Sequence, residues 1–285
     1  MRFYPTTYTC TIAMPELPEV ETIANGVHQR THGQTILAVW TSNKPQTFKS
    51  PPAQIAEVLT QSRIDRVHRV GKTIVLDLTH GQRPAQFLVH LGMTGRLLVS
   101  TPETPHPPHT HAILTLDGGP DGIKELRFVD PRRFGRLSVT EAEYTGPGRE
   151  PLTISIEDFI ALFRKRKTPI KAALLNQSLL HGVGNIYADE ALFHAKIRPT
   201  RHAGRLTHDE LTRLRAALIK VLKAAIKLGG SSVSDYVDAE GVAGFFQLHH
   251  HVYSRTGEPC RVCKTPIKRI VLAGRSTHYC PSCQK

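Results

Sequence analysis

The stretch Thr145-Gly-Pro-Gly-Arg-Glu-Pro-Leu152 separates two parts of the chain that have different hydrophobic patterns. Before it, short runs alternate between apolar and polar residues, as is typical of β-strands with one face in a core. After it, apolar residues recur every three or four positions, which is typical of amphipathic helices. Pro and Gly at this change of pattern indicate a connection between domains. We therefore predict an α+β multidomain fold with a hinge at 146–153.

The residues before this stretch predict one helix and a set of short strands. Apolar residues at helical spacing favour an amphipathic helix over 15–31. The strands expected after it are Ile36–Trp40, Ile64–Val70, Thr73–Leu78, Gln86–His90, Arg96–Val99, Ala112–Leu116, Glu125–Val129 and Arg136–Val139. Short strands separated by Gly and Pro favour an antiparallel β-sandwich. We assign 14–145 to this N-terminal domain, a sandwich flanked by helices.

The residues after the hinge predict a helical domain over 154–252. Ser155 can cap a helix that runs through Phe163, and a second helix fits Ile170–Gln177. Thr207 and Glu210 form a capping box for a longer helix, which Gly229 ends. The consecutive histidines at 249–251 are flanked by apolar residues. For them we predict a strand of partly solvated side chains, with a second metal site as the alternative.

Four cysteines near the C-terminus have the spacing of a zinc site. Cys260, Cys263, Cys280 and Cys283 form two C-x2-C pairs, which can bring four thiolates to one tetrahedral Zn²⁺. Two disulfides are the alternative, and a reducing compartment disfavours them. The residues between the pairs predict a two-stranded hairpin that turns near Gly274, with Arg275 near its tip. A hairpin this small depends on the metal for its stability, so we expect one structural zinc in a zinc finger over 253–285.

The charge of the chain indicates a polyanionic partner. The 285 residues include 37 Lys and Arg against 24 Asp and Glu, a formal net charge of +13. Such an excess is typical of nucleic-acid-binding proteins, with a merely soluble basic surface as the alternative. No apolar run approaches the ~18 residues of a membrane-spanning helix. The segment 1–13 is rich in threonine and lacks the apolar core of a signal peptide, so we expect a cytoplasmic protein.

A second informative stretch, Met14-Pro15-Glu16-Leu17-Pro18-Glu19-Val20-Glu21, has the composition of a catalytic N-terminus. The nitrogen of Pro15 within a peptide is a tertiary amide and cannot act as a nucleophile. If translation starts at Met14 and the methionine is removed, that nitrogen becomes a secondary amine that can form an iminium with a sugar carbon. We therefore expect 1–13 to be a misassigned leader. The alternative for Glu16 is an acid that only favours the helix dipole.

A glycine-containing stretch, residues 181–190, predicts a helix that starts near Asn185. Exposed backbone amides at a helix start can bind phosphate. Basic residues precede it, namely Arg164, Lys165, Arg166, Lys167 and Lys171. We therefore predict phosphate contacts here, although glycines that serve only helix packing are the alternative.

Seven motifs together make the chain resemble the bacterial formamidopyrimidine-DNA glycosylases, the Fpg or MutM branch of the Fpg/Nei family. They are MPELPEVE at 14–21, GK at 71–72, HLGMTG at 90–95, DPRRFG at 130–135, GVGNIYADEALF at 182–193, GEPC at 257–260 and GRSTHYCPSCQK at 274–285. The resemblance covers residues 14–285 and implies that the helical domain is of the helix-two-turn-helix type. The LPEV form of the opening and the DPRRFG segment favour the purine-lesion branch over the Nei branch.

The resemblance implies a chemistry and a set of site residues. Pro15 would attack the anomeric carbon of a damaged nucleotide, Glu16 would transfer protons, and Glu19 would support them. The other residues implied are Lys72, Asn185 and Arg275 at phosphates, with Met93, Arg132 and Phe134 filling the space left by the everted base. Core positions for Met93 and Phe134 and a surface position for Arg132 are the alternatives. The polar stretch 230–244 resembles the family's lesion loop, which closes over the base.

The implied function is excision of oxidised purines from double-stranded DNA, with strand cleavage by β,δ-elimination at the resulting abasic site. We expect a monomer that is associated with the nucleoid and makes no membrane contact. Two alternatives remain. One is a Nei-like glycosylase for oxidised pyrimidines. The other is a non-catalytic zinc DNA-binding protein, which requires that residues 1–13 are retained.

Overall fold

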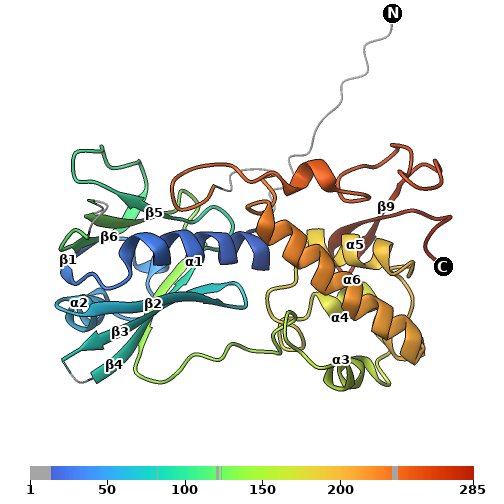
Figure 1. Ribbon diagram of the computed structural model, residues 1–285, viewed down its shortest axis with the longest axis horizontal. Coiled ribbons are helices and arrows are strands. Elements are labelled where there is room, and N and C mark those ends of the chain that lie inside the picture. The colour runs from blue at the N-terminus through green and yellow to red at the C-terminus, as the bar shows by residue number, and fades with distance from the viewer. Residues whose placement is uncertain (1–13, 82, 120–121, 123, 233–236) are drawn as a thin grey trace, which may run out of the picture.

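A computed structural model describes residues 14–285 except 82, 120–121, 123 and 233–236. The segment 1–13, with Cys10, and part of the predicted lesion loop 230–244 therefore lie outside the described residues. Figure 1 shows a two-lobed molecule, with the two four-stranded β-sheets in one lobe and the helices α3 to α6 in the other, where β9 also lies. Helix α1, Leu17–Thr31, extends from the sheet lobe toward the helical lobe. The predicted α+β architecture is confirmed.

The N-terminal lobe is an antiparallel β-sandwich. One sheet has the order β1-β6-β7-β5 and the other the order β2-β3-β4-β8. Their bounds are β1 Ile36–Thr41, β2 Arg63–Val70, β3 Thr73–His80, β4 Arg83–His90, β5 Arg96–Ser100, β6 Thr110–Leu116, β7 Glu125–Val129 and β8 Arg136–Thr140. Each overlaps a predicted strand. The prediction succeeded because the alternating apolar residues on which it was based, such as Phe87 and Val89, point into one shared core. Helix α2, Pro52–Leu59, adds Ile55 and Leu59 to that core.

The C-terminal lobe is helical and ends in a hairpin. Its elements are α3 Ile156–Phe163, α4 Ile170–Leu174, α5 Asn185–His194, α6 His208–Lys227, β9 Lys268–Leu272 and β10 Arg275–Tyr279. It also contains short 3-10 turns at Ala203–Arg205 and Phe246–His249, and a further one lies in the N-terminal lobe at Pro45–Thr47. The predicted caps are confirmed, since Ser155 Oγ accepts from Asp158 N and Thr207 pairs reciprocally with Glu210. Among the described residues, no helix is long and apolar enough to span a bilayer.

Three local predictions were wrong. The first helix begins at Leu17 rather than Pro15, because Glu16 is extended and serves as its N-cap. The helix α4 ends at Leu174, since the side chain of Gln177 instead bonds the backbone of the turn before α5. The histidine run is not a strand. Residues 246–249 form a 3-10 turn, and the backbone amide of His251 then donates to the carboxylate of Glu190.

Helix α1 joins the two hydrophobic cores. Its first residue, Leu17, packs in the core of the helical lobe, and Leu17 N donates to Gly182 O at 3.0 Å. One turn later, Val20 and Ile23 pack in the core of the sandwich. The residues that precede Leu17 therefore lie where the two lobes meet.

A second connection between the lobes involves ionic contacts. Arg69 of β2 donates to both carboxylate oxygens of Glu150, each at 3.0 Å, and to Glu21 of α1 at 2.7 Å. His181, which precedes α5, places its Nε2 3.2 Å from Glu150 Oε2. Burial alone raises the pKa of the Glu150 carboxyl. The contacts with His181 and Arg69 outweigh that effect and lower the pKa to about 2.

This lowered pKa predicts a pH-dependent stability. The folded pKa of Glu150 lies below its ordinary value of 4.5, so its contribution is complete above pH 4.5 and is lost as the pH falls toward 2. A shift of this size corresponds to ~3 kcal/mol. We expect Glu150→Gln to lower the free energy of unfolding by up to that amount at pH 7, with the difference from wild type shrinking below pH 4.5. Urea unfolding of both proteins across this pH range tests it, and a pH-independent difference would contradict it.

Candidate functional site

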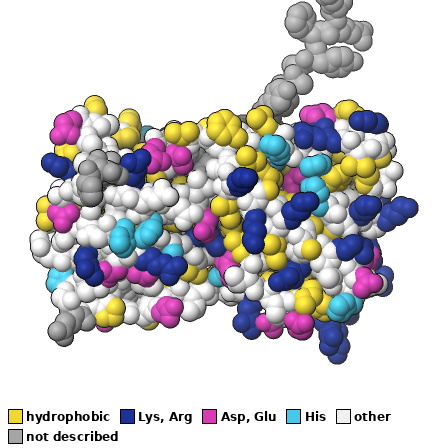
Figure 2. Space-filling model, viewed as in Figure 1, with side chains coloured by type: hydrophobic (Ala, Val, Ile, Leu, Met, Phe, Trp, Pro, Cys, Tyr) yellow, Lys and Arg dark blue, Asp and Glu magenta, His cyan; other side chains and the backbone are white. Residues whose placement is uncertain are grey.

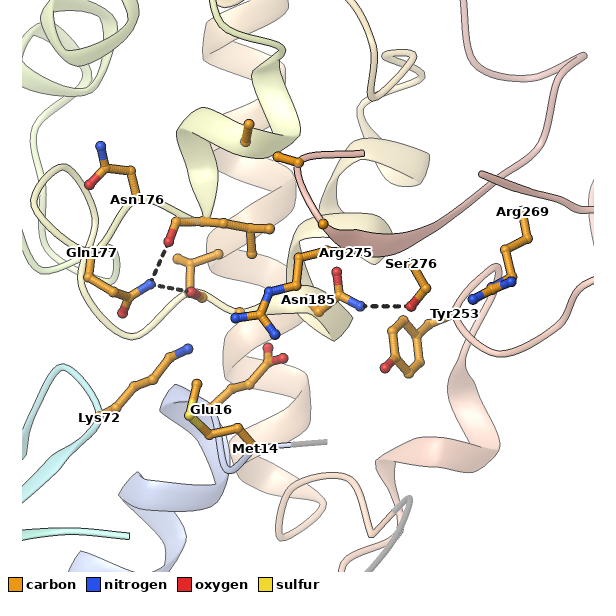
Figure 3. Close-up of a pocket in the computed structure, with 16 residues that line it drawn as sticks. Met14, Glu16, Lys72, Asn176, Gln177, Asn185, Tyr253, Arg269, Arg275 and Ser276 are labelled. Atoms are coloured by element: carbon orange, nitrogen blue, oxygen red, sulfur yellow. Dashed lines mark hydrogen bonds between the residues drawn. The ribbon is translucent and has the colours of Figure 1, made fainter. Parts of the chain in front are cut away.

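A cavity of about 450 Å³ lies where the N-terminal end of α1 meets α5 and the C-terminal hairpin. Figure 3 shows Glu16 and Arg275 extending toward one another, and Lys72 pointing toward them from one side. The residues that line it are Met14, Glu16, Lys72, Ala172, Leu175, Asn176, Gln177, Val183, Gly184, Asn185, Tyr253, Arg269, Ala273, Gly274, Arg275 and Ser276. The structure thus brings Glu16, Lys72, Asn185 and Arg275, which the sequence predicted as site residues, to one place.

The carboxylate of Glu16 is bound at the N-terminus of α5. Its Oε1 accepts from Ile186 N at 3.0 Å, and its Oε2 accepts from Tyr187 N at 3.4 Å. These are first-turn amides without partners inside the helix. A Cβ atom at Gly184 would lie 2.1 Å from the Glu16 carboxyl carbon, so this close approach requires glycine. The predicted phosphate seat at these amides is therefore wrong, since Glu16 fills it.

Two buried acids lie side by side at the start of α1. Burial raises the pKa of Glu16, against the lowering effects of Lys72 and of the α5 amides. Burial and the neighbouring Glu16 raise the pKa of Glu19 to about 7. Glu19 accepts hydrogen bonds from Glu16 N, from Tyr187 Oη and from Ser231 N. The site can thus hold a proton near neutral pH, and Ser231 links it to the beginning of the segment 230–244.

Lys72 lines the cavity, and the predicted nucleophile Pro15 lies in the chain region that borders the cavity. Pro15 is buried between Met14 and Glu16, both of which line the cavity. Lys72 directly precedes β3, and burial lowers the pKa of its ammonium group although Glu16 and Glu19 act to raise it. Thr73 pairs with His90, so Lys72 lies beside the end of β4. The loop that carries Met93 leaves the sheet at that point.

The hairpin holds Arg275 at the cavity through buried contacts. Arg275 opens β10, directly after a turn at Ala273 and Gly274 in which both residues have positive φ. Asn185 Nδ2 donates to Ser276 Oγ at 3.3 Å, which ties the start of α5 to the same strand. The exposed Arg275 side chain therefore lies over a cavity whose far side carries the carboxyl of Glu16.

The prediction that Lys171 contacts phosphate is contradicted by its position. Lys171 is 1% exposed, and its Nζ lies 2.7 Å from Asp189 Oδ1. The same ammonium donates to Ser276 O and Thr277 Oγ1 of β10. Asp189 also accepts from His278 N. Lys171 and Asp189 therefore form a buried ion pair that fastens the hairpin to α4 and α5, and Lys171 is not free to bind a ligand.

Two loops of the sandwich lie against each other and carry the other predicted residues. Phe134 is 46% exposed, and the Arg132 guanidinium lies 4.9 Å from its ring centroid. Asp130, which is fully buried, accepts from Thr94 Oγ1, Arg132 N and Gly135 N. Met93 is half-buried on the adjoining loop. The exposed aromatic ring of Phe134 excludes the alternative that this residue lies in the core.

Sequence reasoning missed the residues that shape these sites. They are Asp130, Tyr187, Asp189 and Glu190, all buried and all acceptors or donors to backbone or charged groups. Asp189 and Glu190 adjoin on a helix that the sequence placed correctly. Two acids on the buried part of a helix signal paired charges, since an unpaired buried carboxylate is costly.

The four predicted cysteines form one cluster. Their sulfur atoms lie within 4.8 Å of one another, with Sγ–Sγ distances of 3.9 Å for Cys260 and Cys283 and 3.4 Å for Cys263 and Cys280. Four thiolates at ~2.3 Å from one tetrahedral Zn²⁺ lie ~3.8 Å apart, so the cluster fits the ion. The predicted structural zinc is confirmed, and all four ligand positions are taken by the protein.

Buried acids for proton transfer, next to a candidate amine nucleophile and beneath an arginine that can reach an anionic backbone, are what an enzyme acting on a sugar–phosphate polymer requires. Models of the formamidopyrimidine-DNA glycosylase N-terminal domain, its H2TH domain, and the zinc finger found in FPG and IleRS match 14–137, 147–237 and 257–285. The formamidopyrimidine-DNA glycosylase of Solibacter usitatus is 45% identical over 95% of this chain and 100% of its own length.

Solved structures of other proteins are also similar over nearly the whole chain. The MutM (Fpg) protein of Thermus thermophilus is 40% identical, with a TM-score of 0.83 over 95% of this chain and 98% of that one. A point mutant of the Lactococcus lactis FPG, in complex with a Fapy-dG containing DNA, is 32% identical, with a TM-score of 0.86 over 95% and 100%. The chain belongs to the formamidopyrimidine-DNA glycosylase family, which confirms the resemblance read from its motifs.

The buried ion pair predicts that Lys171 acts on stability. Lys171→Met leaves the Asp189 carboxylate buried without its partner, which typically costs about 3–5 kcal/mol. The exposed Lys167→Met is the matched control, with an expected change within about 0.5 kcal/mol. Urea unfolding measures both, and Lys171→Met combined with Asp189→Asn should recover part of the loss. Equal stability of the two single variants would contradict a stabilising role for the ion pair of Lys171 and Asp189.

Proposed function

We propose that this protein is a DNA glycosylase and abasic-site lyase that removes oxidised purines, such as 8-oxoguanine and formamidopyrimidines, from duplex DNA. The observation that carries the proposal is the position of Glu16. Its carboxyl directly follows Pro15, is buried at the N-terminus of α5, has a raised pKa, and faces the cavity that Arg275 and Lys72 also line. An acid of this kind can give and take protons beside a sugar carbon.

The proposed chemistry begins with the Pro15 amine. Its lone pair forms a bond to C1′ of the damaged nucleotide as the glycosidic bond breaks. The departing base takes the electron pair of that bond and the proton that the now positively charged Pro15 nitrogen gives up. The restored nitrogen lone pair then forms a C=N iminium as the C1′–O4′ bond breaks, and Glu16 protonates O4′. Removal of a proton from C2′ then expels the 3′ phosphate. Removal of a proton from C4′ afterwards expels the 5′ phosphate.

This chemistry requires a free N-terminal Pro15. The match to the family's N-terminal domain begins at Met14, which supports a translation start there followed by removal of the methionine. The domain limits 14–145, 154–252 and 253–285, with a hinge at 146–153, remain part of the proposal. So does the role of 230–244 as the lesion loop, of which Ser231 and Ala239 contact the N-terminal half through Glu19 and Val99.

The proposed DNA contacts are of two kinds. Lys72, Asn185 and Arg275 bind the phosphates next to the lesion. Met93, Arg132 and Phe134 fill the space that the everted nucleotide leaves, with Phe134 beside the estranged base. Figure 2 shows Lys and Arg side chains gathered over the helical lobe, in agreement with a formal charge of +13. We further propose that the protein works as a monomer at the nucleoid, where its substrate lies.

The nucleophile can be identified by reductive trapping. Borohydride should covalently link the protein that begins at Pro15 to DNA containing 8-oxoguanine opposite cytosine, because only a free amine forms an iminium. A chain that retains 1–13 should give no adduct. Glu16→Gln should abolish base release while DNA binding persists. Efficient trapping by a chain verified to contain residues 1–13 would contradict Pro15 as the nucleophile and indicate a lysine instead, with Lys72 as the first candidate.

The phosphate contacts predict a change in salt dependence. Arg275→Ala should reduce the magnitude of the slope of log affinity against log salt by about one unit. Each phosphate contact of a cation releases counterions from the DNA, and the variant makes one such contact fewer. Lys72→Ala should behave alike, whereas Phe134→Ala should impair lesion recognition and spare most nonspecific affinity. Binding titrations at several salt concentrations measure this, with the exposed Arg213→Ala on α6 as control. Unchanged slopes in both cationic variants would remove the phosphate contacts from the proposal.

A further inference from the structure

A second group of potential metal ligands, which shares no residue with the four cysteines, lies at the C-terminal half of α5. It consists of Glu190, His194 and His251, and one ligand atom of each lies within 4.8 Å of the others. Glu190 and His194 are four residues apart, so they share one face of the helix. His251 comes from the segment between the 3-10 turn at 246–249 and the zinc finger.

The geometry of these three residues matches that of a cation site. His251 Nδ1 lies 3.5 Å from Glu190 Oε2. Two ligand atoms that each lie ~2.1 Å from one tetrahedral ion are ~3.4 Å apart, so this pair is already at the separation that a shared ion requires. The two imidazole rings lie 4.5 Å apart, at an interplanar angle of 70°. Their ring nitrogens can therefore approach one ion from different directions.

The ligands are also held in place by the surrounding structure. Backbone amides of His251, Val252 and Tyr253 all donate to the Glu190 carboxylate, which is 1% exposed. The His251 ring is stacked on Phe193, with centroids 5.3 Å apart. Such contacts fix ligand orientation in metal sites, where each ligand is typically held by a further hydrogen bond or packing contact. His194 is exposed, so an ion can enter from solvent.

We propose that Glu190, His194 and His251 form a second zinc site, distinct from the four-cysteine site. One carboxylate and two imidazoles are a ligand set that Zn²⁺ accepts, and they leave a fourth position for water. The ion would join α5 to the segment that leads into the zinc finger. The neighbouring histidines do not contribute. His250 Nε2 lies 3.1 Å from Ser231 Oγ, and His249 is outside the cluster.

The test counts zinc in the full-length protein whose four-cysteine site is already loaded. Equilibrium dialysis against increasing free Zn²⁺, followed by elemental analysis, should give two zinc ions per wild-type chain and one in His194→Gln and in His251→Gln. His249→Gln is the matched control, because it removes a histidine from the same run but not from the cluster, and it should retain two.

The proposal is independent of catalysis, because the measurement is of bound metal. Thermal unfolding gives a second readout, since an ion that binds the folded state raises the melting temperature. Added Zn²⁺ should raise it in wild type and in His249→Gln, and not in the other two variants. A wild-type protein that stops at one zinc per chain, or a second zinc that persists in His194→Gln and His251→Gln, would overturn the proposal.

Discussion

The contact between the Glu16 carboxylate and the first amides of α5 is the interaction on which the rest of the site depends. Glu16 comes from the residues before α1, and Ile186 and Tyr187 come from the other lobe, so the site exists only when the lobes are joined. A buried carboxylate needs such donors, because without them its desolvation is not compensated. Gly184 is the element of the sequence that makes the approach possible.

Other buried charges position the remaining groups around this contact. Glu19 accepts hydrogen bonds from Glu16 N and Ser231 N, so the two acids and the segment 230–244 are linked by one hydrogen-bond network. The pair of Lys171 and Asp189 fixes the position of β10 and with it the place of Arg275. The zinc cluster closes the base of the same hairpin. Glu16 and Arg275, which face the cavity, are thus positioned by interactions that lie outside it.

The sequence predicted the strands, the helix caps and the cysteine cluster, because these follow from local patterns such as the capping box at Thr207. It predicted which residues meet at the cavity only through the family resemblance. The prediction of a phosphate contact failed for Lys171. Because this residue follows other cations, the sequence favours an exposed position for it, and only the fold shows that Asp189 lies beside it. The sequence also predicted that the α5 amides bind phosphate, because nothing local indicates that Glu16, 170 residues away, occupies them.

The path of α1 through both hydrophobic cores limits how the chain can be divided. A fragment cut at the connection between the lobes would leave Leu17 with the sandwich, while the place it fills lies among the helices. The helical fragment would then carry a hole in its core, and the sandwich fragment would expose an apolar end of its first helix. The two lobes therefore have different architectures, but neither has a complete core without the other. Fragments mixed in solution should reassociate through the N-terminal end of α1.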